Sequence, residues 1–383
     1  MISLPAGFVA HVANIGIKDA STDFLVISAS QTVPGTGVFT QSRFAGPSVG
    51  LSRRAVADGQ LRAFAVVSKN ANVATGKAGA EDADEIVKSL ASLLGCQPHD
   101  VLLASTGVIG RRYPMERIRD HLGAMEVPFT TTDATECAKA IMTTDTRVKV
   151  AQAFVGNATV VGIAKGVGMI EPDMATLITL FMTDARLAPG ELRPLFKRVI
   201  DKTFNCVSID TDTSTSDTAA MMASGMAGAV DRSAFETALE AVALSLTKQI
   251  ARDGEGATKL LSVTVDYARD PEQAKFVAKS IVNSPLVKTA VHGADPNWGR
   301  VAMAIGKCQQ YTDISPDRVV IRFGTQEVYP HQVDKAGLAA LGKYMAGEDV
   351  HVHVSLNTGN DRATVYGCDL SDGYVRINGD YTT

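Results

Sequence analysis

The sequence is poor in the features that mark several large classes of protein. Its 383 residues include five cysteines, which are scattered and never form a CxxC pair, and seven histidines without an HExxH motif. This spacing argues against a disulfide framework and against a zinc site. The 37 basic and 41 acidic residues give a net charge of −4, so no overall positive field could hold a nucleic acid. No apolar run approaches the roughly 18 residues of a membrane span. We therefore expect a metal-free cytoplasmic protein with neither nucleic acid nor membrane as a partner.

The common catalytic motifs are missing as well. The chain contains no GxxxxGK[ST] loop, no GxSxG elbow and no cysteine within a supporting histidine motif. The GVG at residues 166–168 is too short to be the dinucleotide fingerprint GxGxxG. We therefore expect no nucleotide cofactor, and the residues of the chain itself have to supply any chemistry.

The residues that are present predict a layered α/β fold, an α+β sandwich of sheets and helices. Apolar residues make up 45% of the chain and charged residues 20%, which is typical of a globular protein with a core. Helical and strand-like periodicities alternate along the whole chain. Helices are predicted at residues 81–94 and 192–200, and further helices are predicted to begin after Pro114, at the capping-box pairs Asp133/Glu136 and Ser233/Glu236, and after Pro271. Strands are predicted at residues 63–67, 101–104, 159–163, 177–182, 261–265, 319–323, 350–354 and 364–366.

Four segments do not fit a packing pattern, because they are dense in Gly, Thr, Ser, Asp and Asn. They are STGVIG (105–110), KGVGMIEPDMAT (165–176), DTDTSTSDT (210–218) and HGADPNWGR (292–300). Such segments are usually solvated connections. In one of them, however, Thr176 lies where an irregular glycine-containing loop becomes an apolar strand pattern. A β-branched residue commonly begins a strand, so this position alone is ordinary. A threonine at a free N-terminus, however, can be activated by its own α-amine, whose pKa of about 7.7 to 8.0 makes it a suitable base at neutral pH.

Seven segments together resemble the ornithine acetyltransferase family, the bacterial glutamate N-acetyltransferases. They occur in the order expected for that family and span nearly the whole chain: STGVIG, IMTTDTR, KGVGMIEPDMATL, DTDTSTSDT, EGATKL, DPNWGR and YVRINGDYTT. Each piece alone is weak evidence, but their joint occurrence is specific. The stretches SRFAGPSV, GRRYPME and VNSPLVKTAVHGADPNWGRVAMAIGKC resemble most the ornithine acetyltransferases associated with clavulanic acid biosynthesis.

The resemblance implies a self-cleaving N-terminal-nucleophile enzyme, with a fold similar to that of the DmpA aminopeptidases. Cleavage between Ala175 and Thr176 would give an α chain of residues 1–175 and a β chain of residues 176–383 in one intertwined body, assembled as an α2β2 heterotetramer. Thr176 would then carry the acetyl group from N2-acetyl-L-ornithine to L-glutamate in a ping-pong reaction. The products would be ornithine and N-acetylglutamate.

The resemblance also assigns roles to individual residues. Thr176 is the implied nucleophile, with its α-amine as the base. Thr106, through its hydroxyl, and Gly107, through its backbone N–H, are the implied oxyanion hole. The implied substrate contacts are Thr143, Lys165, Thr176, Glu255, Asn378 and Thr383, with no cofactor and no metal. The Gly379-Asp380 pair beside Asn378 departs from the expected pattern.

The sequence is also consistent with two other functions. The first is a hydrolase, because amidases and aminopeptidases use the same N-terminal threonine chemistry and differ in admitting water. The second is an uncleaved relative that binds amino acids without catalysis. The sequence also leaves open whether acetyl-CoA serves as a donor and whether the product enters arginine or a specialised pathway.

Overall fold

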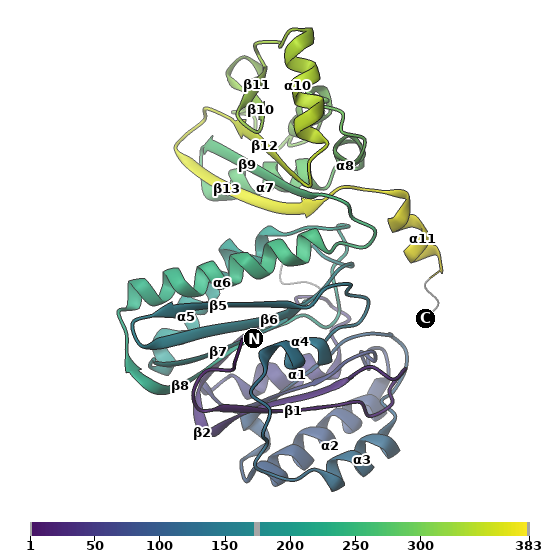
Figure 1. Cartoon of the computed structure of the whole chain (residues 1–383), viewed down its shortest axis with the longest axis vertical. Coiled ribbons are helices and arrows are strands. Elements are labelled where there is room, and N and C mark those ends of the chain that lie inside the picture. The colour runs from purple at the N-terminus through teal and green to yellow at the C-terminus, as the bar shows by residue number, and fades with distance from the viewer. Residues whose placement is uncertain (1, 172–176, 381–383) are drawn as a thin grey trace. The chain divides into compact units, whose positions relative to one another are not determined.

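The computed structural model describes residues 2–171 and 177–380, and this part of the chain divides into two compact units. The first unit contains the described residues up to 205 together with 212–246. The second contains residues 206–211 and the described residues from 247 onward. Figure 1 labels the elements of both units, and each unit is described by itself below.

The first unit is built on a sheet with eight strands among the described residues. The strand order is β4-β3-β2-β8-β7-β6-β5, and β1 pairs with β2 off this path. The bounds are β1 Phe8–Ala13, β2 Phe24–Phe39, β3 Gln60–Val67, β4 Val101–Ser105, β5 Lys149–Val155, β6 Ala158–Lys165, β7 Ile178–Arg186 and β8 Thr218–Ala229.

Helices cover both faces of this sheet, because its strands are apolar on both sides. On β2, Phe24 and Val26 pack into one cluster with the helix residue Ile86, whereas Leu25 and Ile27 pack into another cluster with residues of other helices. Successive side chains of a strand point to opposite faces, so the unbroken apolar run requires a cover on each face. The helices are α1 Pro47–Ala55, α2 Gly76–Leu94, α3 Met115–Ala124, α4 Ala134–Ala140, α5 Pro189–Lys202 and α6 Arg232–Arg252, whose last residues belong to the second unit.

The centre of this sheet joins the two sides of the segment around Thr176. β6 runs antiparallel to β7, with Lys165 opposite Ile178, and β7 runs parallel to β8, with Ile178 opposite Thr218. Residues 165 and 178 therefore face each other on neighbouring strands, although the segment between them contains the predicted cleavage bond. Ala175 and Thr176 themselves lie outside the described residues.

The second unit has a five-stranded sheet within the described chain, in the order β11-β10-β12-β9-β13. Strand β9 lies between β12 and β13: it pairs in parallel with β12 and antiparallel with β13. Apolar residues of α7, including Val277 and Ile281, pack with Val263 and Val365 of this sheet. The bounds are β9 Leu260–Ala268, β10 Val320–Phe323, β11 Gln326–Tyr329, β12 Asp349–Ser355, β13 Asp361–Cys368, α7 Pro271–Val282, α8 Pro285–His292, α9 Trp298–Gly306, α10 Lys335–Met345 and α11 Asp372–Asp380, with the short 3-10 turn η3 Pro316–Arg318. The 3-10 turn η1 Pro98–Asp100 belongs to the first unit, and η2 Phe204–Cys206 lies where the chain passes from the first unit to the second.

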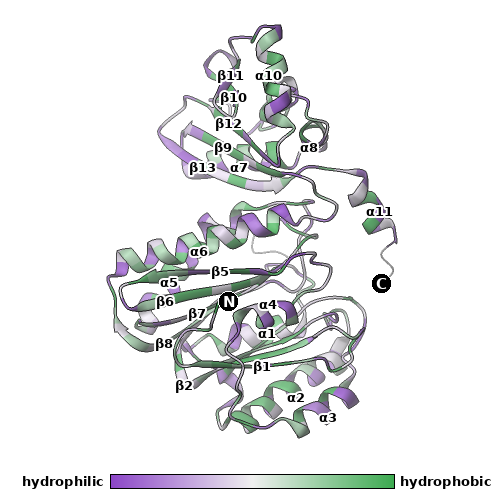
Figure 2. Cartoon of the chain, viewed as in Figure 1, coloured by the Kyte–Doolittle hydropathy of each residue, from purple (hydrophilic) through white to green (hydrophobic). Residues whose placement is uncertain are grey.

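The predicted α/β character is confirmed, and every predicted helix and strand is present with shifted ends. Figure 2 shows the pattern behind this success, with largely hydrophobic strands and helices that alternate between hydrophobic and hydrophilic residues. Gly95 ends α2 in the left-handed region with φ 64°, as expected for a helix stop. Sequence reasoning missed strands rich in small or polar residues, such as β8, and short helices containing glycine, such as α11.

One helix start was predicted wrongly. The capping box expected from Ser233 and Glu236 does not form, because α6 already begins at Arg232. Asp231 takes the capping role by accepting the backbone N–H of Ala234 at 2.8 Å. Glu236 instead pairs with Arg198, 2.7 Å away.

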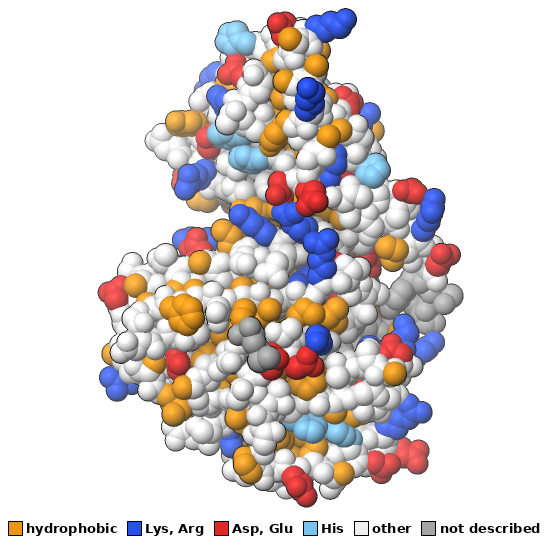
Figure 3. Space-filling view, in the orientation of Figure 1, with side chains coloured by type: hydrophobic (Ala, Val, Ile, Leu, Met, Phe, Trp, Pro, Cys, Tyr) orange, Lys and Arg blue, Asp and Glu red, His pale blue; other side chains and the backbone are white. Residues whose placement is uncertain are grey.

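The surface carries charges of both signs. On the face shown in Figure 3, acidic and basic side chains are interspersed over both units. Within the described residues, no helix is long and apolar enough to cross a membrane.

Candidate active site

The turn after β4 presents the predicted oxyanion residues. Thr106 is buried, with 7% of its surface exposed, and its backbone N–H bonds to Val67 on the neighbouring strand. Gly107 follows with φ +128°, and an added Cβ would lie 2.2 Å from the carbonyl carbon of Lys69. Only glycine fits this position, because the turn passes directly against the backbone of the adjacent segment. Within the described chain, the Gly107 N–H has no acceptor. It is thus a fixed donor, available to an oxyanion.

Lys165 lies beside this turn. It is the last residue of β6 and only 4% exposed, and its Nζ donates a hydrogen bond to Thr106 Oγ1 at 3.0 Å. Two residues that are 59 positions apart are therefore in direct contact. The buried ammonium places positive charge at the predicted oxyanion hole, where a developing negative charge would be stabilised.

A third residue, Asp145, holds this cluster together and was not predicted. Its side chain is fully covered, and its Oδ1 accepts Lys149 Nζ at 2.7 Å and the Gly166 N–H at 2.8 Å. Its Oδ2 accepts the backbone N–H of Thr143 at 3.1 Å. Burial alone would raise the pKa of Asp145, but Lys165 and Lys149, with these hydrogen bonds, outweigh burial and lower it. An ionised carboxylate thus anchors both the Thr143 loop and the end of β6.

Asp217 is a second residue that sequence reasoning missed, and it contacts the residue that follows Thr176. Its Oδ1 accepts the Leu177 N–H at 2.6 Å, while the Leu177 carbonyl accepts the N–H of Thr218 at 3.0 Å. Asp217 is 1% exposed, and its Oδ2 is buried without a hydrogen-bond partner in the described structure. Burial raises the pKa of Asp217 well above its usual value, against smaller opposing contributions from its neighbours.

Asp145 and Asp217 both lie in segments that had already been singled out, IMTTDTR and DTDTSTSDT. The only available signal was an acidic residue within a run of hydroxyl residues. Such a run does not reveal which carboxylate is buried, because burial is set by strands distant in the sequence.

Two other predicted residues meet in the second unit. Glu255 lies in the loop between α6 and β9, and Asn378 lies on α11. Asn378 Nδ2 donates to Glu255 Oε2 at 3.0 Å and to the carbonyl of Tyr374 at 3.0 Å. The structure thus brings Thr106, Gly107, Thr143 and Lys165 together in the first unit and Glu255 with Asn378 in the second. Ala175, Thr176 and Thr383 lie outside the described residues.

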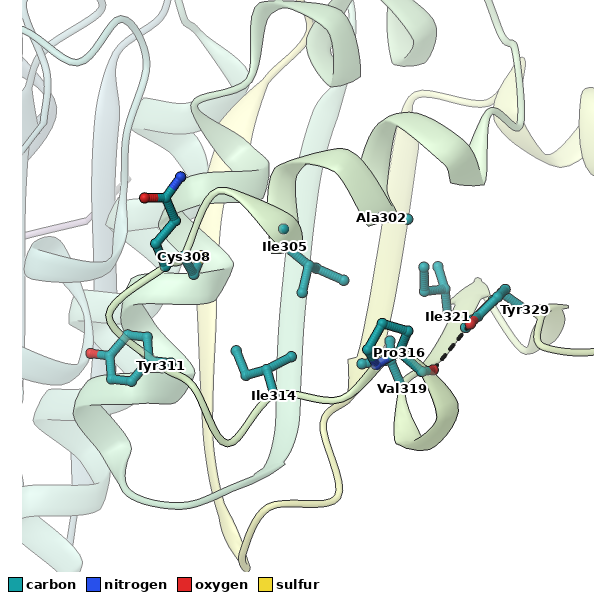
Figure 4. A pocket seen from close by; sticks show the side chains of 11 residues that line it. Ala302, Ile305, Cys308, Tyr311, Ile314, Pro316, Val319, Ile321 and Tyr329 are labelled. Carbon is teal, nitrogen blue, oxygen red and sulfur yellow. Dashed lines mark hydrogen bonds between the residues drawn. The ribbon is translucent and has the colours of Figure 1, made fainter.

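A pocket in the second unit contains none of the predicted site residues. Its wall comes from α9, the following turn and the β10–β11 hairpin, and includes Ile305, Cys308, Tyr311 and Ile321. Figure 4 shows these side chains around the hollow, with the Tyr329 hydroxyl bonded to the Pro316 carbonyl at 3.0 Å. The lining is mostly apolar and includes no acid–base pair, so it is a poorer candidate for catalysis than the Thr106–Lys165 cluster.

Comparison with known proteins shows the family of the chain. A profile of the ArgJ family matches residues 9–383. The chain is 58% identical to glutamate N-acetyltransferase Oat2 of Streptomyces clavuligerus, over 99% of this chain and 98% of that protein. It is 55% identical to arginine biosynthesis bifunctional protein ArgJ 2 of a Nostoc species, over 100% of this chain and 98% of the relative. It is 44% identical to arginine biosynthesis bifunctional protein ArgJ of Thermus thermophilus, over the full length of both. The chain therefore belongs to the ArgJ family.

Proposed function

We propose that this chain is a glutamate N-acetyltransferase that cleaves itself between Ala175 and Thr176. It then moves the acetyl group of N2-acetyl-L-ornithine to L-glutamate. Family membership and the names of relatives that match over their full length support this activity. The observation that carries the site assignment is the buried contact of Lys165 with Thr106, next to the open N–H of Gly107.

In the proposed maturation step, Thr176 Oγ attacks the carbonyl carbon of Ala175. The peptide C–N bond breaks as the ester C–O bond forms, and the released nitrogen takes up the hydroxyl proton. Water then hydrolyses the ester, which leaves a carboxylate on Ala175 and an amino group on Thr176. Because β6 and β7 are paired on either side of this bond, cleavage leaves the sheet intact.

In the proposed transfer, the Thr176 amine accepts the proton as Oγ attacks the acetyl carbonyl. The resulting oxyanion would be held by the Gly107 N–H and the Thr106 hydroxyl, and one such donor is typically worth about 3 to 4 kcal/mol of barrier. Ornithine leaves as the protonated amine, and an acetyl ester remains on Thr176. The amine of glutamate then attacks this ester, which restores the threonine and gives N-acetylglutamate.

The substrate contacts follow from charge. Lys165 suits the α-carboxylate of the substrate, and Glu255 with Asn378 suits the distal ammonium of ornithine. Thr143 and Thr383 complete the proposed set. Neither a metal nor a cofactor enters any step of this mechanism.

The test compares the wild-type chain with Thr176→Ala and Thr176→Ser by intact-mass measurement and by acetyl transfer. We expect the wild type to yield fragments 1–175 and 176–383, and Thr176→Ala to remain one polypeptide with turnover reduced by at least about a thousandfold. Thr176→Ser retains a hydroxyl and should still cleave. An active wild-type enzyme that remains a single polypeptide would contradict the proposal.

A second measurement separates transfer from hydrolysis. With N-acetylornithine but no glutamate, a transferase should release one equivalent of ornithine in a burst and then little acetate. Continuous acetate release at the rate of ornithine release would identify an amidase instead. Acetyl-CoA in place of N-acetylornithine then tests for the second donor.

We further propose that the cleaved chains assemble as an α2β2 heterotetramer in the cytoplasm. The shared sheet in the first unit, to which residues before and after Thr176 both contribute, supports the association of one α with one β chain. The doubling to α2β2 follows only from the family resemblance. Support for the cytoplasmic location is the state of the cysteines, which are all free thiols and, apart from Cys96, buried.

A further inference from the structure

Asp369 is a buried carboxylate with no role in the proposed chemistry. It follows β13, and its side chain is fully covered. Its Oδ1 accepts the backbone N–H groups of Thr258 and Lys259 at 2.8 and 2.9 Å, and its Oδ2 accepts the Thr258 hydroxyl at 2.6 Å. Oδ2 also accepts Nδ1 of His292 at 2.7 Å. Burial would raise the pKa of Asp369, but the hydrogen bonds from Thr258, His292 and Lys259 outweigh it and lower the pKa. Asp369 is therefore an ionised acceptor with four donors.

These donors come from two segments that are distant in the sequence. Thr258 and Lys259 end the loop that contains Glu255, and His292 is the last residue of α8. Lys288 precedes His292 by one helical turn, so both side chains lie on the same helix face. Lys288 Nζ donates to the Cys368 carbonyl at 2.6 Å. One face of α8 thus holds both Cys368 and Asp369 in place.

The Glu255 loop is fastened along its length to the segment after Asp369. The Ser371 hydroxyl donates to the Gly256 carbonyl at 2.5 Å. Gly256 has φ +69°, and an added Cβ would lie 2.3 Å from the Tyr374 nitrogen, so this approach of two backbones requires glycine. At the end of the loop, the buried Lys259 Nζ donates to the carbonyls of Val291 and Met345 at 2.8 and 2.6 Å.

We propose that His292 and Asp369 are positioning residues that set the geometry of the Glu255–Asn378 pair, and so select the acetyl donor by its distal ammonium. The inference rests on the proposed function, because that function makes Glu255 the contact for ornithine. It also gives a role to the HGADPNWGR segment, whose first residue is His292. His292 and Asp369 act through Glu255 and take no part in bond making at Thr176.

A ping-pong enzyme makes this role measurable, because kcat/KM for each substrate reports only its own half-reaction. N-acetylornithine carries a distal ammonium, whereas glutamate carries a carboxylate. A displaced Glu255 should therefore impair the first half-reaction and leave the second nearly unchanged. A general loss of structure would lower both values together.

The experiment compares His292→Asn with His292→Gln. The amide nitrogen of asparagine lies near the position of Nδ1 and can still donate to Asp369, whereas that of glutamine extends toward the position of Nε2. We expect His292→Gln to lower kcat/KM for N-acetylornithine about tenfold, which corresponds to about 1.4 kcal/mol, and His292→Asn to restore most of it. In both variants, kcat/KM for glutamate should stay within about twofold of wild type. Because His292 is 39% exposed, both variants should fold, which the melting temperature checks.

The matched control is His331→Gln. His331 also pairs with a carboxylate, Glu327 at 2.6 Å, but is 87% exposed and remote in sequence from the Glu255 loop. The His331→Gln substitution should change kcat/KM neither for N-acetylornithine nor for glutamate. Equal losses in both half-reactions, or equal effects of His292→Asn and His292→Gln, would overturn the proposal.

Binding separates this inference from the proposed function. In the Thr176→Ala background, calorimetry should show about tenfold weaker binding of N-acetylornithine when His292→Gln is added. If the wild type fails to transfer acetyl groups while this difference is found, the function is wrong and the positioning role stands. If the wild type transfers and binding does not change, the positioning role is wrong.

Discussion

At the scale of single residues, two of the buried carboxyl groups in the first unit have pKa values shifted in opposite directions. Asp145 is surrounded by two lysines and backbone N–H groups, which lower its pKa. Asp217 accepts the Leu177 N–H, but burial dominates and raises its pKa. Asp145 therefore anchors the Thr143 loop and the end of β6, whereas Asp217 holds Leu177, just before β7.

The raised pKa of Asp217 predicts a specific pH dependence of stability. Above about pH 4, the unfolded chain loses the Asp217 proton while the folded chain keeps it. The free energy of unfolding therefore falls with rising pH until the folded carboxyl group also ionises. Asp217→Asn retains an acceptor for Leu177 but does not titrate, so its melting temperature relative to wild type should rise from pH 4 toward pH 8.

Thermal denaturation across this range, with the exposed Asp317→Asn as the control, measures the effect. Identical pH profiles for wild type and Asp217→Asn would contradict the assignment. Such a result would mean that the carboxyl group ionises at the same pH in both states.

At the scale of elements, strand β1 and helix α3 are joined by a pair of histidines. Nε2 of His11 lies 2.9 Å from Nε2 of His121, so one ring must donate and the other accept. Burial and the neighbouring histidine lower the pKa of His11, and burial lowers the pKa of His121. Phe24 and Phe129 pack against these rings. The contact therefore depends on at least one neutral imidazole.

Mild acid should weaken this contact. As the pH falls through about 6.5, the unfolded chain takes up protons before the folded chain does, so the free energy of unfolding decreases. His121→Gln keeps a polar group near Nε2 but cannot titrate. Between pH 7.5 and 5, the melting temperature of the wild type should therefore fall further than that of His121→Gln. The accompanying increase in amide hydrogen exchange should be confined to β1 and α3. Equal losses would show that the pair does not titrate on unfolding.

The elements also show what local sequence could predict. Helix α2 has apolar residues at helical spacing and a terminal glycine, and β4 is a short apolar run, so both were predicted from neighbouring residues alone. β8 was missed because its alanines, glycines and methionines have no clear period. It forms a strand because β2 and β7 flank it on either side, which is a property of the sheet.

At the scale of the whole molecule, the proposed cleavage should leave one particle. β6 and β7 share a ladder from Val160 opposite Thr183 to Lys165 opposite Ile178, so the two products remain hydrogen-bonded in one sheet. We expect the fragments to migrate together in gel filtration under native conditions, at the mass of two copies of each, and to separate only in denaturant. Fragments that separate without denaturant would contradict both the shared sheet and the α2β2 assembly.

The sequence alone determined the alternation of helices and strands, the glycine at the turn after β4, and the family; the set of site residues stays a prediction. These properties depend on near neighbours along the chain or on the order of short motifs. Tertiary structure decided which acidic groups are buried and what they bind: Asp369 meets Thr258 from 111 positions away, and Asp217 meets Leu177 from 40. The physical reason is that a carboxylate's solvation and donors depend on segments brought together by the sheets, which no local pattern encodes.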